Sequence, residues 1–211
     1  MSFILTNLGT LANDQAQYEL AEIHFKEALT LAKEMNDRAR VSHLLANLGA
    51  LAMSRKEFSQ ANAYLEEGLA LARKMDHREN VCLLLTNKGV LLKEQGDFKD
   101  SEMYFEEAFS LAKEMGHRRY CAAIQSNRGE LHLVMKRWDK ADKAFREALK
   151  IAKEIHLQEI VAGSLNGLAR SATERGDRED ARRKGEESLE IFRRIKHRRA
   201  DEVEAWLKNF K

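Results

Sequence analysis

Four asparagines recur at one fixed interval, and their side chains can recognise a peptide backbone. A primary amide offers two hydrogen-bond donors and an acceptor, so it can pair with both the N–H and the C=O of an extended peptide, whatever its sequence. Two alternatives stay open: the amide ties one helix to the next, or gene duplication alone copied it. The four residues, 40 positions apart, are Asn7, Asn47, Asn87 and Asn127.

The interval of these asparagines is the period of the whole chain. A glycine follows each asparagine by two residues, and a small residue and a large apolar residue follow further on at constant distances. A fifth, weaker copy has Gly167 and Ala169 in place of the asparagine and the glycine. The period predicts five repeats, at about 1–38, 39–78, 79–118, 119–158 and 159–198.

Each repeat shows the apolar spacing of two helices. Val41, Leu44, Leu45 and Leu48 follow the i, i+3, i+4, i+7 pattern of an amphipathic helix, and a second such pattern begins at Phe58. Turn residues interrupt the pattern once in the middle and once at the end of the repeat. The pattern therefore predicts two antiparallel helices per repeat, called here helix A and helix B, with left-handed caps at Gly96 and Gly176 and N-caps at Asp97 and Asp177.

Gly49 lies inside a predicted helix, where glycine costs about 1 kcal/mol relative to alanine. Such a glycine is tolerated where another chain segment must come close. We expect Gly49 on helix A and Ala61 on helix B to let the two helices nest, with Phe58 and Leu65 packed around them.

Composition limits the classes of protein that are possible. The 211 residues are 44% hydrophobic and 33% charged, which favours a folded rather than a disordered chain, and no proline is present. A net charge of +2 implies neither nucleic acid nor membrane as a partner. No apolar run reaches the roughly 18 residues that span a bilayer, and the first ten residues lack the features of a signal peptide. Two cysteines are too few for a disulfide framework, which favours a cytoplasmic setting.

Metal and catalytic sites find little support in the sequence. His77, His117 and His197 hold equivalent turn positions, so their backbones should lie about 10 Å or more apart, too far to share one ion. No phosphate-binding loop, nucleophile elbow or paired-carboxylate motif is present, so we expect neither a cofactor nor an enzyme. The basic stretch 178–199 shows no interleaving of aromatic and basic residues and no DNA-reading motif, which argues for a solvated face rather than a nucleic-acid site.

The repeat resembles the tetratricopeptide repeat (TPR). The match rests on the large and small residues at that family's characteristic places: Leu45, Leu48, Gly49, Phe58, Ala61, Leu65 and Gly68. The period exceeds the usual length of about 34 residues and resembles a subclass of about 40–42 residues, as in kinesin light chains. It reads most like the C-terminal sensor arrays of bacterial STAND-type signalling ATPases and regulators. The resemblance implies an all-α fold: a right-handed α-solenoid of five helix-turn-helix (TPR-like) repeats plus a C-terminal capping helix.

The resemblance also implies where the asparagines point. In TPR arrays the A helices line a concave groove, and in long-repeat families an asparagine ladder in this groove holds an extended peptide backbone. Residues beside the ladder should then select the ligand, or else pack between adjacent A helices. These groove neighbours are Met53, Val90, Lys93, Glu130, Leu133 and Arg170.

The two ends of the array differ. Arg178 and Gly185 replace aromatic residues of the repeat, and Val203, Trp206, Leu207 and Phe210 then form an apolar stripe, so we expect residues 199–211 to cap the last repeat. No such cap precedes the first helix. We expect that the chain is an excerpt of a longer protein or self-associates through its N-terminal end.

The function that this sequence favours is non-catalytic binding of a protein or peptide segment, as the sensor or scaffold part of a larger signalling protein. One alternative is a structural scaffold that self-associates and leaves its groove empty. Another is contact with nucleic acid through the basic C-terminal region.

Overall fold

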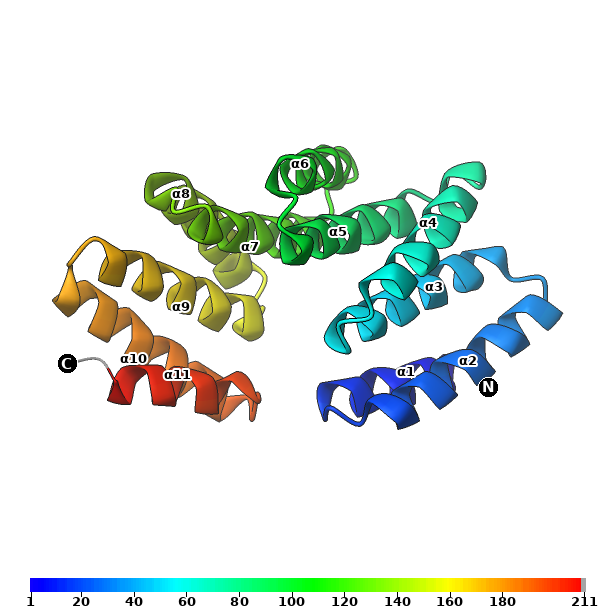
Figure 1. Ribbon diagram of the computed structural model, residues 1–211, viewed down its shortest axis with the longest axis horizontal. Helices are drawn as coiled ribbons and strands as arrows, with labels where there is room; N and C mark the ends of the chain where they lie inside the picture. The colour runs from blue at the N-terminus through cyan, green and yellow to red at the C-terminus, as the bar shows by residue number, and fades with distance from the viewer. Residues whose placement is uncertain (210–211) are drawn as a thin grey trace. The chain divides into compact units, whose positions relative to one another are not determined.

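The computed structural model describes residues 1–209, in which eleven α-helices and no strand are present. The prediction for Phe210 lies outside these residues. The helices are α1 (Ser2–Asp14), α2 (Tyr18–Glu34), α3 (Arg38–Ser54), α4 (Phe58–Lys74), α5 (Arg78–Gln95), α6 (Phe98–Glu114), α7 (Arg118–Val134), α8 (Trp138–Glu154), α9 (Gln158–Glu174), α10 (Arg178–Arg194) and α11 (Arg199–Lys208) (Figure 1). The predicted all-α fold of five helical hairpins followed by a further helix is confirmed.

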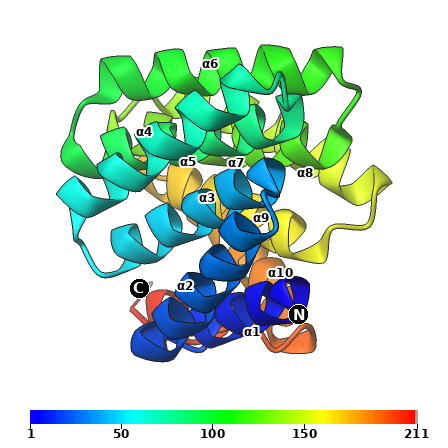
Figure 2. The same ribbon diagram turned by 90° about the vertical axis from the view of Figure 1, so that its right-hand side faces the viewer.

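The chain divides into two compact units, Met1–Leu111 and Ala112–Lys211, and the boundary falls near the end of α6. Unit 1 contains the hairpins α1/α2, α3/α4 and α5/α6, which Figure 2 shows one above the other, with α1 and α2 at the bottom. Unit 2 contains the hairpins α7/α8 and α9/α10, and α11 packs against α10.

Ten turns separate the helices, and each contains one residue in the left-handed conformation. These residues are spaced 20 apart, so the helices between consecutive turns have nearly the same length. At the α3–α4 turn the N–H of Glu57 donates to the carbonyl of Ala52 at 2.9 Å and that of Lys56 to Met53 at 2.9 Å, the bonding pattern of a Schellman cap. Gly96 and Gly176 have φ of +84° and +79° as predicted, whereas seven turns use a non-glycine residue.

Close packing within the first four hairpins explains the glycine that follows each repeated asparagine by two residues. A Cβ atom on Gly49 would lie 2.7 Å from Cδ2 of Leu65 and 3.6 Å from the carbonyl oxygen of Ala61, so the predicted nesting of α3 and α4 is confirmed. Gly9, Gly89 and Gly129 meet phenylalanines in the same way. The phenylalanine or leucine of each pair is buried, which contributes about 1.5–3 kcal/mol per side chain.

Candidate functional site

A cleft of about 390 Å³ lies on the face formed by α1, α3 and α5, the three A helices of unit 1. Its walls come from the first half of α1 and from the starts of α3 and α5, so three successive repeats each contribute one side. The lining combines one aromatic ring with amide, hydroxyl, imidazole, guanidinium and carboxylate groups: Phe3, Thr6, Asn7, Asp37, Ala39, Arg40, His43, His77 and Asn80.

The buried amide of Asn80 holds the floor of this cleft together. The side chain is 6% exposed, and its Nδ2 donates to the carbonyl of Ala39 at 2.7 Å and to Oγ of Ser42 at 2.6 Å. Both acceptors are on α3, whereas Asn80 is on α5. The two helix starts are therefore fixed relative to each other before any ligand binds.

Two N-caps border the cleft. Asp37 accepts a hydrogen bond from the backbone N–H of Arg40 at 3.0 Å and another from its Nε at 3.1 Å, so the carboxylate both caps α3 and pairs with the guanidinium. His77 caps α5 through Nδ1, which accepts from the N–H of Asn80 at 3.3 Å. An Nδ1 that accepts leaves the ring proton of neutral His77 on Nε2.

His43 has the most perturbed environment of the titratable groups in the cleft. Burial lowers the pKa of its imidazole because it disfavours the charged form. A hydrogen bond with Asn80 raises that pKa, and the charges of His77 and Arg40 lower it. The ring is half-buried in the cleft wall.

The structure places the four ladder asparagines in different surroundings. Asn7 is exposed and lines the cleft, and Asn47 on α3 is half-buried. Asn87 on α5 donates from Nδ2 to the carbonyl of Ala46 on α3 at 3.2 Å, so this amide does tie one A helix to its neighbour. Asn127 is half-buried on α7 of unit 2.

The groove neighbours also differ from one another. Met53 and Val90 are half-buried, and Nζ of Lys93, whose side chain is 17% exposed, lies 3.0 Å from a carboxylate oxygen of Glu94. In unit 2, Leu133 is buried in a cluster with Ala141, Phe145 and Leu168, as in the alternative of packing between helices. Arg170 on α9 pairs with Glu130 on α7 at 2.8 Å.

Sequence reasoning missed most of the cleft, although a signal was present. His43 lies four residues before Asn47, and Arg40 lies seven before it, so both share its helix face one and two turns earlier. The predicted groove neighbours all follow the asparagine position of their repeat, whereas these residues precede it. Phe3 lies four residues before Asn7 and lines the cleft in the same way.

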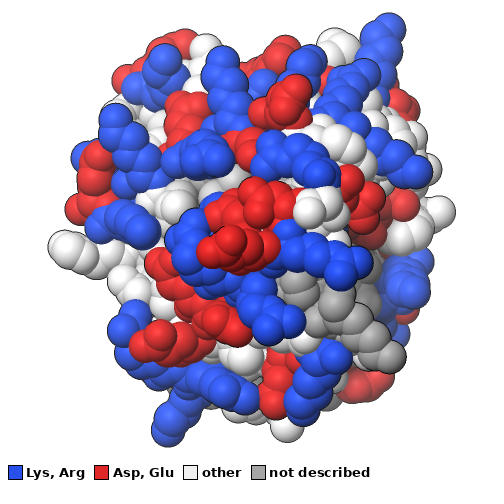
Figure 3. All heavy atoms as spheres, turned by 90° about the vertical axis from the view of Figure 1, so that its left-hand side faces the viewer, with Lys and Arg blue, Asp and Glu red and all other residues white. Residues whose placement is uncertain are grey.

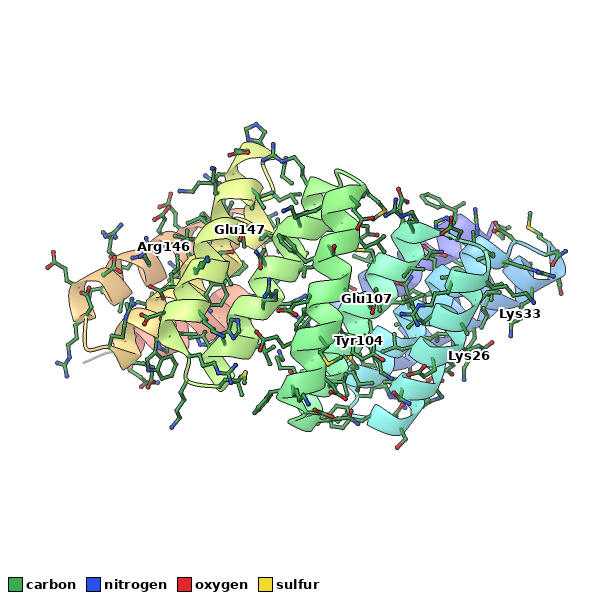
Figure 4. The ribbon with its side chains drawn as sticks, turned by 90° about the horizontal axis from the view of Figure 1, so that it is seen from above. Lys26, Lys33, Tyr104, Glu107, Arg146 and Glu147 are labelled. Carbon is green, nitrogen blue, oxygen red and sulfur yellow. The ribbon has the colours of Figure 1, made fainter. Side chains whose placement is uncertain are left out.

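A second cleft, of about 500 Å³, lies between α4 and α6. Figure 4 shows Tyr104 and Glu107 of α6 on the side that faces α4. Glu107 pairs with Arg73 of α4 at 2.8 Å, and the remaining lining is mostly acidic: Asp100, Met103 and Glu106.

Turn histidines and the basic stretch have structural roles. His77 and His117 cap helices, and Nδ1 of His197 accepts from the N–H of Arg199 at 3.2 Å. Within residues 1–209 no group of histidine, cysteine and acidic side chains is placed to hold a metal ion. Acidic partners neutralise part of the basic stretch: Asp180 pairs with Arg183 and Lys184, and Glu204 pairs with Arg193 at 2.8 Å. Figure 3 shows the two signs of charge mixed on this side of unit 2.

Residues 3–207 match the MalT-like TPR region. The chain belongs to this TPR family. No curated protein matches the sequence. In the part of the chain that the structure describes, none of the helices combines the length and the apolar character that a membrane span requires.

Solved structures with the same fold include three that differ widely in setting. BtubC from P. vanneervenii is 19% identical with a TM-score of 0.71, and the match covers 91% of this chain and 80% of that one. A STAND protein with a TPR sensor from Pyrococcus horikoshii is 17% identical with a TM-score of 0.76 over 98% of this chain and 32% of its own. The Rap conjugation gene regulator of plasmid pLS20, in complex with the Phr* peptide, is 17% identical with a TM-score of 0.80 over 92% of this chain and 54% of its own. The chain thus spans about a third to a half of the latter two proteins.

Proposed function

We propose that this TPR chain is a non-catalytic, cytoplasmic binding module that holds an extended peptide segment against its A helices. The observation that carries the proposal is the cleft of about 390 Å³ on α1, α3 and α5, which is preformed and has both an apolar and a polar side. Concave sites with a few fixed polar groups are the usual places for ligands.

The groups in the cleft suit a peptide backbone with an apolar side chain. The ring of Phe3 is 64% exposed and can cover such a side chain, while the exposed amide of Asn7 can pair with the backbone. One hydrogen bond contributes only about 0.5–1.5 kcal/mol, so useful affinity needs further contacts along the face. Asn47, Met53, Val90 and Lys93 would supply them on the A helices of unit 1. Asn127, Glu130 and Arg170 are the corresponding predicted residues of unit 2, whereas Leu133 is buried there.

The related structures agree with this proposal. One Rap regulator of this fold is in complex with a peptide, and one STAND protein uses a TPR region as its sensor. By analogy, we propose that this chain is the sensor or scaffold part of a larger signalling protein.

A random hexapeptide library tests the proposal. Bound peptides are measured by fluorescence polarisation with the native chain, with the double variant Asn7→Ala/Asn47→Ala, and with Asn209→Ala as the control, since Asn209 is exposed at the end of α11. Asn87 is left intact because its amide joins α5 to α3. We expect binding that falls at least about tenfold in the double variant and is unchanged in the control. A native chain that captures no peptide would overturn the proposal.

A second candidate is self-association through α1. Ile4, Leu8 and Leu11 are 58%, 42% and 54% exposed, whereas their counterparts in α3, Leu44, Leu48 and Leu51, are at most 2% exposed. We propose a second copy of this chain as the occupant of this α1 face. A symmetric contact between two α1 faces would close the assembly at two copies.

Sedimentation of the native chain and of Leu8→Lys tests whether the chain forms a dimer through α1. Lysine occupies the equivalent position 88, so the substitution is compatible with the repeat. We expect a dimer that becomes monomeric in the variant. A native chain that remains monomeric at about 100 µM would refute this second candidate, since specific dimers hold together well below that concentration.

A further inference from the structure

The charge of the A-helix cleft is set by few groups. α1 carries no charged side chain before Asp14, so its wall contributes only Phe3, Thr6 and Asn7. From α3 come Asp37, Arg40 and His43, and from the start of α5 comes His77. Asp37 is the one carboxylate of the lining, and it already accepts two hydrogen bonds from Arg40.

Hydrogen-bond donors therefore outnumber free acceptors in this cleft. Asp37 uses Nε of Arg40, while a guanidinium has four further N–H groups on its terminal nitrogens. Because Nδ1 of His77 accepts the hydrogen bond that caps α5, the ring donates through Nε2. The exposed amide of Asn7 adds two more donors. A ligand that brings an acceptor, and above all an anionic one, complements this set.

We propose that the cleft binds a carboxylate of the peptide ligand through Arg40, His43 and His77, with an affinity that rises as the pH falls from 7.5 to 6.0. This inference rests on the proposed peptide-binding function and names the chemistry that the ligand must bring. Phe3, on the α1 wall of the cleft, would cover an apolar group next to the carboxylate.

The pH dependence follows from linkage between ligand and proton. In the free chain, burial lowers the pKa of His43, and the neighbouring His77 and Arg40 lower it further, whereas a hydrogen bond with Asn80 raises it. A bound carboxylate would raise the pKa of His43 again, because an opposite charge within about 4–6 Å favours the protonated ring. Binding then takes up a proton, so a lower pH favours the complex. Asp37 is the only acidic side chain among the described residues that line the cleft.

Two small probes test the site in the full chain. N-acetylphenylalanine carries a carboxylate beside an aromatic ring, and N-acetylphenylalanine amide has the same shape without the charge. Their dissociation constants are measured by following the imidazole C–H signals of His43 and His77 by NMR at pH 7.5 and 6.0. We expect the carboxylate to bind more tightly than the amide and to gain about threefold to tenfold in affinity at pH 6.0. Equal affinities for the two probes would overturn the proposal.

Variants of His43 and His77 test which of the two residues is responsible for the carboxylate binding and its pH dependence. His43→Gln keeps a hydrogen-bonding side chain but cannot take up the proton, so the gain at pH 6.0 should shrink to less than twofold. His77→Asn removes an imidazole from the cleft, whereas His117→Asn is the matched control, because His117 caps α7 of unit 2 through the same bond from Tyr120. We expect weaker binding of the carboxylate probe by His77→Asn and unchanged binding by His117→Asn. A gain at pH 6.0 that survives in His43→Gln would overturn the role of His43, and the comparison of the two probes on the native chain decides the proposal even where a variant fails to fold.

Three sets of hexapeptides distinguish the carboxylate site from the proposed peptide-binding function. They also show whether the bound carboxylate is a side chain or the C-terminus of the peptide. One set carries an internal aspartate with an amidated C-terminus, another carries asparagine with a free C-terminus, and a third has neither carboxylate. If all three sets bind equally, peptide binding stands and the carboxylate site is refuted. If the small probe binds but no hexapeptide does, the carboxylate site stands and the peptide-binding function fails.

Discussion

The indole ring of Trp206 on α11 lies directly against the backbone of Gly185 on α10. A Cβ atom on Gly185 would come within 2.6 Å of Cζ3 of Trp206 and 3.0 Å of Cδ2 of Leu207. In the earlier repeats this position carries a buried phenylalanine or leucine: Phe25, Leu65, Phe105 and Phe145. The glycine in the last repeat therefore leaves the space into which α11 packs. Val203 of this capping helix is 2% exposed.

Gly185→Ala should therefore destabilise unit 2. The added methyl group would displace the Trp206 ring, at a cost of about 1–3 kcal/mol, which exceeds the gain of about 1 kcal/mol from helix propensity. Urea unfolding followed by tryptophan fluorescence measures the change. Gly163→Ala is the control, because the new Cβ would meet only the end of the Arg199 side chain at 3.3 Å, and we expect it to be neutral or stabilising. Equal effects of the two substitutions would contradict the packing of Trp206 on Gly185.

In the turns between helices, introducing a glycine should stabilise the fold. Lys136 holds a left-handed conformation with φ of 55° at the α7–α8 turn, the place that Gly96 and Gly176 hold in other repeats. A side chain in this conformation costs about 1–2 kcal/mol. Lys136→Gly should raise the free energy of unfolding by about 1 kcal/mol, measured by urea unfolding. Lys136→Ala keeps the strain and should change little, so a similar gain in both variants would rule out this explanation.

The repeat pattern made the local structure predictable, because each helix and turn depends on residues close in sequence. Gly49, Leu65 and the cap at Gly96 follow from spacing alone. The cleft was harder to predict, because it depends on Asn80 of one repeat reaching Ala39 and Ser42 of another. The asparagine ladder illustrates the same limit: the four residues share one register, but Asn87 bonds to Ala46 while Asn7 lines the cleft. Identical positions in a repeat do not imply identical contacts.

Lowering the pH should reduce the stability of α3, because His43 lies on this helix. Because burial lowers the pKa of His43 in the folded chain, the unfolded chain binds more protons between the two pKa values. The free energy of unfolding is then highest above the unfolded value and falls as the pH drops through that interval. Hydrogen exchange by mass spectrometry, corrected for the intrinsic rate, should show less protection of Arg38–Ser54 at pH 5.5 than at pH 7.5. His43→Leu, with the residue found at the equivalent position 83, should reduce this difference, and an undiminished difference would exclude His43 as its cause.

Lys88 on α5 places a charged side chain, 8% exposed, where α3 and α9 have Leu48 and Leu168. Its Nζ donates to Oδ1 of Asn62 and pairs with Glu66, both on α4. Only the lysine of this pair is buried, because the Glu66 side chain is 54% exposed. Replacing a buried charge by an apolar residue is often neutral or stabilising, whereas removing Glu66 leaves the Lys88 ammonium with the neutral Asn62 as its hydrogen-bond partner.

Lys88→Leu should therefore leave the free energy of unfolding of unit 1 unchanged or raise it by up to about 1 kcal/mol, whereas Glu66→Ala should lower it by about 1–3 kcal/mol. Hydrogen exchange of α4 and α5 reports both changes, since both tryptophans lie in unit 2. The double variant separates the two contributions: without Lys88, the loss of Glu66 should cost about 0.5 kcal/mol or less, as for an exposed side chain. If the loss of Glu66 costs the same with and without Lys88, the two residues are not coupled and the Lys88 charge is solvated by other means.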